Sequence, residues 1–186
     1  TAWNQQVPLP HPFTGDNAFR LPLFPKFSAN PVSGRENLFK GAIAVAANGI
    51  PIFNPIKQDG RTDTNLAGEL DEYGGHAGRA DDYHYHIAPV HLQKIIGEGK
   101  PIAFALDGYP IYGYKEPDGS PVKDLDWLNG HTDKNGNYHY HATSNYPYLN
   151  GGFRGQVNLA GGQVAVQPKT RGVRPYTRPL RGAKIT

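Results

Sequence analysis

Sulfur is absent from the side chains of this sequence. The chain of 186 residues has Cys 0 and Met 0, which excludes disulfides, a cysteine nucleophile, and thiolate or thioether metal ligands. A chain that lacks both residues suits a protein that meets oxidants or a redox-active metal. Chance, combined with exposure to an oxidising compartment, accounts for the absence equally well.

Long apolar runs and several catalytic signatures are also missing. No stretch is long and apolar enough to span a bilayer, so we expect no membrane insertion. The sequence has no serine nucleophile elbow, phosphate-binding glycine loop or dinucleotide fingerprint. Hydrophobic residues make up 38% of the chain, which is low, whereas Gly 23 and Pro 17 are high. This balance predicts many turns, short strands and little helix.

Positive charge is concentrated at the C-terminal end. Residues 169–186 hold six basic side chains and no acidic one. Because the whole chain has a formal net charge of +3, subtracting these six leaves −3 for residues 1–168. The tail has the character of an extended arm that docks on its own core, contacts a partner chain or stays mobile. One short tail is not the broad basic face of a nucleic-acid-binding protein, so no nucleic-acid partner is predicted.

Two blocks of the sequence are each present twice. IAVAANGIPIF begins at Ile43 and IAFALDGYPIY begins at Ile102, an offset of 59 residues that also relates the following KQDG and EPDG. HAGRADDYHYHIA begins at His76 and HTDKNGNYHYHAT begins at His131, an offset of 55 residues. Two ordered blocks at matching spacing predict a tandem duplication with one four-residue insertion or deletion between the blocks.

Each repeat has the pattern of short β-hairpins. The runs IAVA and IAFAL are apolar and lead into Asn-Gly or Asp-Gly, which favour tight turns, before PIF and PIYGY return as second strands. KQDG and EPDG are typical of turns closed by a left-handed glycine, here Gly60 and Gly119. We predict one mainly β domain, sandwich or barrel-like, whose two hairpin-rich repeats are related by pseudo-twofold symmetry.

The domain has four predicted parts. They are an extended proline-rich segment (1–40), the first repeat (41–99), the second repeat (100–149), and C-terminal strands with the basic tail (150–186). One short helix is predicted between the repeats, in APVHLQKIIGEGKP, where Gly97 and Gly99 end it.

The two histidine-rich stretches predict clustered imidazoles. Side chains alternate between the faces of a strand, so in YHYH the two histidines share one face and the two tyrosines share the other. In the second stretch, a loop of Lys134, Asn135 and left-handed Gly136 would place His131 directly opposite His139. The first stretch has the same loop length, with Asp81 at the left-handed position, so each lone histidine joins its pair.

Three neutral imidazoles with an open coordination position suit Cu²⁺ or Zn²⁺. The predicted metal ligands are His76, His84, His86, His131, His139 and His141. Copper is the first choice, because the ligands are all histidine, tyrosines are adjacent and sulfur is missing; zinc is the second. The six residues could form two sites or one binuclear site. Alternatively, the histidines are structural and hydrogen-bond across the hairpins.

Other polar and aromatic residues have supporting roles in this prediction. Asp81, Asp82 or Asp133 is expected to hold imidazole N–H groups. Aromatic residues that are expected in the core, rather than on a sugar-binding surface, are Trp127, Tyr109, Tyr112 and Tyr114. The pattern leaves out His11 and His91, which are interpreted as ordinary residues.

The strings YHYH at Tyr83–His86 and Tyr138–His141 resemble the signature of the YHYH protein family. GGH ending at His76, NGH ending at His131 and DGYPIYGY from Asp107 are also similar to that family, and the resemblance covers about Gly41 to Tyr148. The family is largely without assigned function, and the resemblance implies a secreted or periplasmic bacterial domain. For the start at Thr1, removal of a secretory signal and trimming are both open.

Three functions are compatible with these features. The first is an extracytoplasmic, histidine-ligated metal-binding protein, with copper and oxidoreductase chemistry, in which Tyr83, Tyr85, Tyr138 or Tyr140 tunes the site or relays electrons. The second is a zinc-dependent hydrolase with a nearby Asp as base. The third is a non-enzymatic carbohydrate- or protein-binding module with structural histidines. The sequence identifies no substrate and no catalytic residue.

Overall fold

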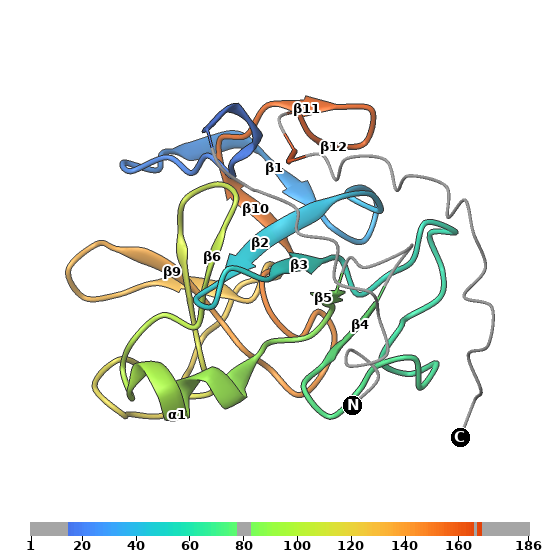
Figure 1. Cartoon of the computed structure of the whole chain (residues 1–186). Helices are drawn as coiled ribbons and strands as arrows, with labels where there is room; N and C mark the ends of the chain where they lie inside the picture. The colour runs from blue at the N-terminus through green and yellow to red at the C-terminus, as the bar shows by residue number, and fades with distance from the viewer. Residues whose placement is uncertain (1–14, 78–82, 166, 169–186) are drawn as a thin grey trace, which may run out of the picture.

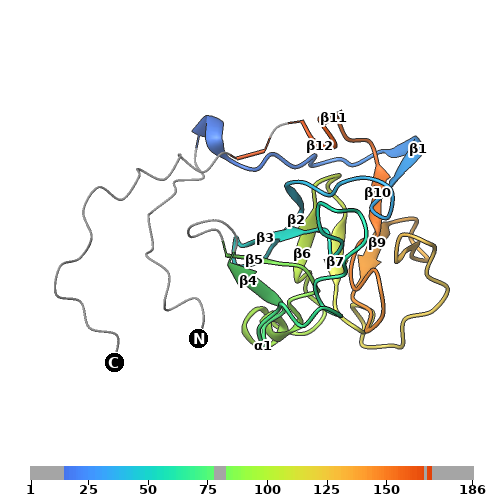
Figure 2. The ribbon, with the colours of Figure 1, turned by 90° about the vertical axis from the view of Figure 1, so that its right-hand side faces the viewer.

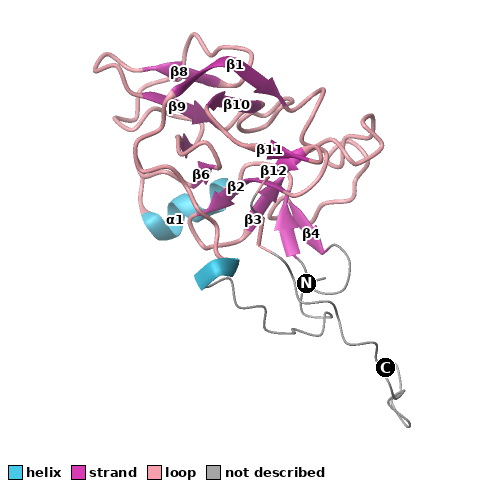
Figure 3. Cartoon of the chain, turned by 90° about the horizontal axis from the view of Figure 1, so that it is seen from above, coloured by secondary structure: helices cyan, strands magenta, loops and turns pink. Residues whose placement is uncertain are grey.

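The computed structural model describes residues 15–77, 83–165 and 167–168. The predictions about His11, Asp81, Asp82 and the basic tail lie outside the described residues. Within those ranges the chain is mainly β with one short helix, as predicted, and Figure 3 shows the short strands linked by extensive loops.

The elements are short throughout. In chain order they are η2 (Gly15–Asn17), β1 (Phe27–Ser33), β2 (Ala42–Ala46), β3 (Pro51–Phe53), β4 (Gly75–Ala77), β5 (Tyr83–Tyr85), η3 (Val90–Leu92), α1 (Gln93–Ile96), β6 (Ala103–Ala105), β7 (Pro110–Tyr112), β8 (Gly130–Thr132), β9 (Tyr138–His141), β10 (Gly152–Gly155), β11 (Leu159–Ala160) and β12 (Gln163–Val164). The predicted helix is the η3–α1 pair, and α1 ends at Gly97, which has φ +97°.

Eight strands form one mixed sheet in the order β4-β5-β3-β2-β6-β7-β9-β8. From one edge inward the order is β4, β5, β3, β2, and from the other edge it is β8, β9, β7, β6. Each strand of the first half therefore matches the strand numbered four higher in the second half. The two halves meet where β2 and β6 pair antiparallel, with Val45 opposite Phe104. In each half one pairing is parallel: β3 with β5, and β7 with β9.

The sheet is open in the part of the chain that the structure describes. Its edge strands are β4 and β8, which do not pair with each other, so the sheet does not close into a barrel. Two small antiparallel sheets, β1 with β10 and β11 with β12, accompany it. Figures 1 and 2 place these small sheets at the opposite end of the molecule from α1.

The predicted turns have the expected geometry. Gly49 and Gly108, of the Asn-Gly and Asp-Gly pairs, have φ +84° and +93°. Gly60 and Gly119 have φ +70° and +85° and donate backbone hydrogen bonds to the carbonyls three residues earlier. A left-handed conformation costs a glycine little, because it has no Cβ to clash with the carbonyl.

The N-terminal segment contains a strand that the sequence pattern did not predict. β1 contains Pro31 and has no apolar alternation, which obscures it in the sequence. It is held by pairing with β10, where Gly152 has φ +147° and lies so close that an added Cβ would contact the Val32 carbonyl. Long-range pairing, rather than local propensity, therefore forms β1.

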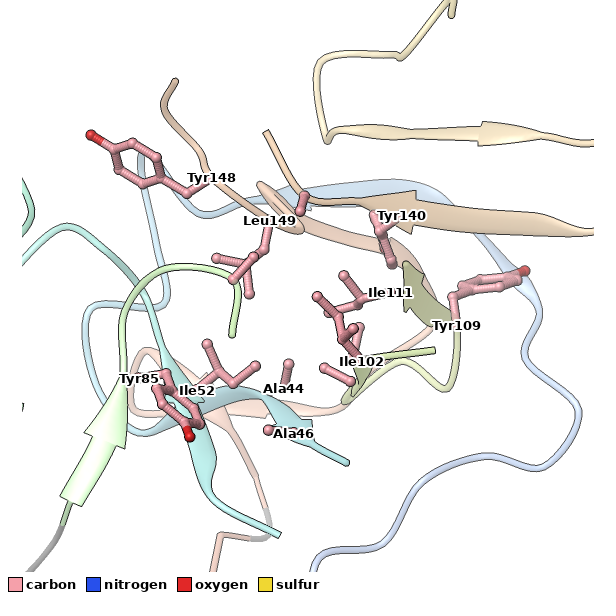
Figure 4. Close-up of a cluster of buried hydrophobic side chains, with 14 of the residues drawn as sticks. Ala44, Ala46, Ile52, Tyr85, Ile102, Tyr109, Ile111, Tyr140, Tyr148 and Leu149 are labelled. Carbon is pink, nitrogen blue, oxygen red and sulfur yellow. The ribbon is translucent and has the colours of Figure 1, made fainter. Parts of the chain in front are cut away.

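The main core is packed against the eight-stranded sheet. Figure 4 shows Ala44, Ile52, Ile102 and Ile111, from the central strands and their flanks, together with Leu149 from the segment before β10. All five are completely buried, at 0% exposure. Leu38, Ile43, Leu106 and Phe153 belong to a second, separate cluster of buried hydrophobic residues.

A buried polar network joins the second half of the sheet to β10. Tyr140 and Asp107 are both 0% exposed, and the Tyr140 hydroxyl donates a hydrogen bond of 2.6 Å to Asp107 Oδ2. The same hydroxyl accepts the Arg154 backbone N–H at 2.7 Å, and Asp107 Oδ2 accepts the Gly155 N–H at 2.8 Å. Tyr85 holds the matching position in the first half. Its hydroxyl accepts a hydrogen bond of 3.1 Å from the side-chain amide of Asn48.

Two aromatic residues predicted to be in the core are exposed. Trp127 is 61% exposed and Tyr114 is 53% exposed, whereas Tyr109 is 7% exposed and Tyr112 is half-buried. Trp127 and Tyr114 lie in loops outside the strands, so strand alternation does not direct their side chains inward. Among the described residues, no helix has the length and apolar character needed to cross a membrane.

Replacing Tyr140 by Phe should destabilise the fold by about 2–3 kcal/mol, because a buried carboxylate and a backbone N–H both lose a partner. Tyr85→Phe, the matched control, should cost less than about 1 kcal/mol, since its hydroxyl has a longer and more exposed partner. Urea unfolding followed by circular dichroism measures both. Equal losses in the two variants would contradict the network described above.

Candidate metal centre

Two hairpins carry the histidine clusters, and their register is the predicted one. In the β8–β9 hairpin His131 is opposite His139, and in the β4–β5 hairpin His76 is opposite His84. The loop of the second hairpin is closed by a hydrogen bond from the Gly136 N–H to the Asp133 carbonyl, and Gly136 has φ +86°. The unchanged gap between lone histidine and YHYH therefore produces a cross-strand histidine pair in both hairpins.

The first cluster consists of His76, His84 and His86. One nitrogen of each ring lies within 4.8 Å of the others, and the Nε2 atoms of His76 and His86 are 3.1 Å apart. His84 and His86 are buried, whereas His76 is half-buried. Three of the predicted ligands thus converge at one edge of the sheet.

The second cluster contains the other three predicted histidines and one carboxylate. Glu116 Oε1 is 3.1 Å from His131 Nε2, and Glu116 Oε2 is 3.3 Å from His139 Nε2 and 3.4 Å from His141 Nε2. His131 Nε2 and His139 Nε2 are 3.0 Å apart. His139 and His141 are buried, and the side chains of His131 and Glu116 are 18% and 17% exposed.

The two clusters are separate. They lie in the hairpins at opposite edges of the eight-stranded sheet, with β3, β2, β6 and β7 between them. At the usual strand spacing this separation is on the order of 20 Å. The arrangement therefore provides two mononuclear sites, and the binuclear alternative does not fit it.

Backbone carbonyls fix the tautomers of three imidazoles. His86 Nδ1 lies 2.7 Å from the Asn54 carbonyl oxygen, and His141 Nδ1 lies 3.0 Å from that of Gly113. A carbonyl oxygen only accepts hydrogen bonds, so Nδ1 carries the proton and Nε2 presents a lone pair to the cluster. His139 Nδ1, 3.3 Å from the Asn137 carbonyl, follows the same rule.

In the second cluster one of these lone pairs has no donor within the described part of the chain. His141 Nε2 is buried and accepts no hydrogen bond from the described residues. It faces a Glu116 carboxylate oxygen, which is also an acceptor, and the lone pair of His139 lies nearby. An arrangement of acceptors around a common point is costly unless a cation lies between them.

The distances match the spacing of ligands around one ion. With metal–nitrogen bonds of about 2.0–2.1 Å, neighbouring ligand atoms lie about 2.9 Å apart at right angles and about 3.4 Å apart in a tetrahedron. Four separations between side-chain atoms of the second cluster run from 3.0 to 3.4 Å, and one ligand atom from each of the four residues lies within 4.8 Å of the others. The described residues therefore fit a bound metal ion.

Burial keeps the innermost histidines neutral. Desolvation, assisted by repulsion from His84, lowers the pKa of His86 to about 3. Desolvation also lowers the pKa of His141, although the Gly113 carbonyl and Glu116 oppose the shift. Neutral imidazole is the form that coordinates a metal ion.

Glu116 is the residue that the sequence analysis missed. It opens the EPDG turn after β7, and that turn also provides the Gly119 N–H to Glu116 carbonyl hydrogen bond. Parallel pairing of β7 with β9 brings the turn beside His139 and His141. The signal in the sequence was the alignment of EPDG with KQDG, in which Glu116 stands at the position of Lys57.

The tyrosines of YHYH lie on the opposite face from the histidines. The Tyr83 and Tyr138 hydroxyls donate hydrogen bonds to Asp71 and Asp126, at 2.9 and 2.8 Å. Burial and these carboxylates raise the pKa of both phenols well above the ordinary value. The aromatic rings beside the histidines are instead Phe53 and Tyr112, which none of the function hypotheses included.

Phe53 and Tyr112 occupy matching places, one beside each cluster. The Phe53 ring stacks on His84 with centroids 4.3 Å apart, and the Tyr112 ring lies 5.3 Å from His139 in an edge arrangement. Each aromatic residue limits the rotation of the histidine that it contacts.

Asp133, the one described residue of the three acidic candidates, does not hold an imidazole. Its Oδ1 accepts the backbone N–H groups of Asn135 and Asn137, both at 2.8 Å, so it caps its own turn. The backbone carbonyls described above take the role expected of a carboxylate. His91, expected to be ordinary, belongs to neither cluster and contacts the Tyr85 hydroxyl at 3.4 Å.

A cavity of about 1020 Å³ opens beside the second cluster. Glu116, His131 and His139 line it on one side, and aromatic residues that include Phe27 and Tyr112 line it elsewhere. Small molecules can therefore approach three of the four clustered side chains from solvent.

These features define a mainly β protein with two histidine clusters that are able to bind metal ions. The family model described as "YHYH protein" matches residues 18–122, which is more than half of the chain. The chain therefore belongs to the YHYH family. The match starts before the predicted Gly41 and ends before the three histidines of the second cluster. Comparisons with curated proteins and with solved structures found no match.

In metal-free protein, His86 and His141 should be in the Nδ1–H tautomer, because each Nδ1 faces a carbonyl oxygen. Long-range ¹H–¹⁵N NMR spectra distinguish the two ring nitrogens. The partly exposed His91 is the internal control, since its ring nitrogen faces a hydroxyl that both donates and accepts. An Nε2–H signal for His86 or His141 would remove the argument for converging lone pairs.

Proposed function

We propose that this protein is a secreted or periplasmic metalloprotein that binds copper at two histidine centres and supports oxidative chemistry there. The observation that carries the proposal is the convergence of ring nitrogens in each cluster, where main-chain carbonyls hold the protons of His86, His139 and His141 on the far side of the ring. Hydrogen bonding between the histidines does not explain the second cluster, because His141 Nε2 is buried there without a donor among the described residues.

Copper is preferred for its chemistry with this ligand set. Imidazole suits Cu²⁺, Zn²⁺ and other late divalent ions, and Cu²⁺ heads the general affinity order. The chain has Cys 0 and Met 0, so it provides no soft ligand for a Cu⁺ carrier. Absence of these residues also removes the side chains that copper chemistry oxidises most readily.

The two centres also support the proposal that the chain is a duplicated unit. Carbonyls at matching positions, Asn54 and Gly113, hold His86 and His141. Val45 faces its own counterpart, Phe104, at the junction of β2 and β6, where a pseudo-twofold axis would pass. Contacts that recur at a constant offset are expected if one unit was copied with its metal site.

The protein residues have defined tasks in this proposal. The carbonyls orient the buried imidazoles, and Phe53 and Tyr112 restrain the rings beside them. A bound copper ion would supply redox and Lewis-acid chemistry. Tyr112, which lies against His139 and lines the cavity, is the tyrosine best placed to exchange an electron or a proton at the second centre.

Elemental analysis of protein purified without an affinity tag tests the proposal. We expect copper near two equivalents, and loss of that copper in the His84→Ala/His139→Ala double variant. Added Cu²⁺ should raise the unfolding free energy of metal-free protein by about 2.7 kcal/mol for each site that is filled at a hundredfold excess over its Kd.

The control for this experiment is His91→Ala, which removes a histidine outside both clusters and should retain the metal. Zinc in place of copper, with hydrolysis of a model ester, would replace the copper proposal by the hydrolase. Absence of metal, together with unchanged thermal stability after Cu²⁺ or Zn²⁺ is added, would reject metal binding.

A further inference from the structure

The two centres differ at one position that faces the metal site. In the second centre Glu116 reaches three imidazole nitrogens at 3.1–3.4 Å. The residue 59 positions earlier, at the same place in the first KQDG turn, is Lys57. The copies therefore carry opposite charges at equivalent points of the fold.

Lys57 is paired with a carboxylate that is not part of the first cluster. Its Nζ lies 2.8 and 3.2 Å from the two carboxylate oxygens of Glu69, and both side chains are partly exposed. Glu69 does not join the first cluster, which contains three imidazoles and no carboxylate among the residues that the structure describes. The first cluster thus offers three neutral donors, whereas the second offers three neutral donors and one anion.

We infer that Glu116 is a fourth metal ligand, so that the two centres are inequivalent and the second binds a divalent ion more tightly than the first. This inference rests on the proposed metal-binding function. A carboxylate adds both a bond and a negative charge at the ion, and it broadens the accepted ions toward harder ones such as Mn²⁺ and Fe²⁺. The nearby ammonium group of Lys57 acts in the opposite sense at the first centre.

Glu116 is also positioned to meet molecules from solvent. Its carboxylate lines the cavity with His131 and His139, whereas His141 is completely buried. With four protein ligands a tetrahedral ion would be closed to further ligands, and an octahedral ion would keep two positions free. The identity of the bound metal therefore decides whether the cavity leads to a reactive ion.

The test is titration of the metal-free full chain with Zn²⁺ and with Cu²⁺, by calorimetry against a competing chelator. Two classes of site are expected. Glu116→Gln, which keeps the shape and removes the charge, should weaken the tighter class about tenfold or more and leave the other class unchanged. The matched variant Lys57→Gln should leave the tighter class unchanged.

Substitution of one partly exposed histidine in each cluster shows which affinity class belongs to which centre. His131→Ala should remove the tighter class, and His76→Ala should remove the weaker one. Electron paramagnetic resonance of the wild type provides a measurement that needs no variant: one Cu²⁺ signal at one equivalent, joined by a different signal at two. If Glu116→Gln fails to fold by circular dichroism, this measurement and Glu116→Asp, expected to have intermediate affinity, decide the question.

Equal affinities at the two sites, identical Cu²⁺ signals, or an unchanged tighter class in folded Glu116→Gln would overturn the inference and leave the proposed function intact. Absence of any bound metal would instead reject the proposed function itself. The two failures are therefore distinguishable.

Discussion

The hydrogen bonds from imidazole Nδ1 to main-chain carbonyls are the interactions on which the site depends. They fix both the ring orientation and the position of the proton for His86 and His141. A side-chain acceptor could rotate or titrate, but a peptide carbonyl inside the fold does neither. The carbonyls themselves are set by the turns that follow β3 and β7. The histidine clusters at the two edges of the sheet are therefore oriented by main-chain geometry.

The parallel pairings connect that geometry to the hairpins. A hairpin alone brings only a lone histidine beside its YHYH partner, as in the His131 and His139 pair. Pairing of β7 with β9 adds the Gly113 carbonyl, the Tyr112 ring and the Glu116 carboxylate. The sheet thus completes a centre that the hairpin begins. The buried network of Tyr140 and Asp107 fastens β9 from the opposite face, so the two faces of this strand have separate tasks.

What the sequence predicted well was local. The hairpin register followed from loop length and a left-handed glycine, and both histidine trios came together because side-chain alternation is a short-range rule. Contacts that cross the sheet were missed, since nothing near Glu116 in the sequence indicates that β7 runs parallel to β9. The β1 strand was missed for the same reason. Trp127 was misplaced because hydrophobicity alone does not say which loop residues are covered.

The junction between β2 and β6 has a consequence for synthesis of the chain. Until residues 103–105 leave the ribosome, β2 has a free hydrogen-bonding edge made of small, buried residues. Because Val45 pairs there with Phe104, which holds the same place in the similar run IAFAL, a chain cut after the first half presents an edge that fits a second copy of itself. Truncated or stalled molecules would therefore associate in pairs through this seam, which the intact polypeptide closes internally.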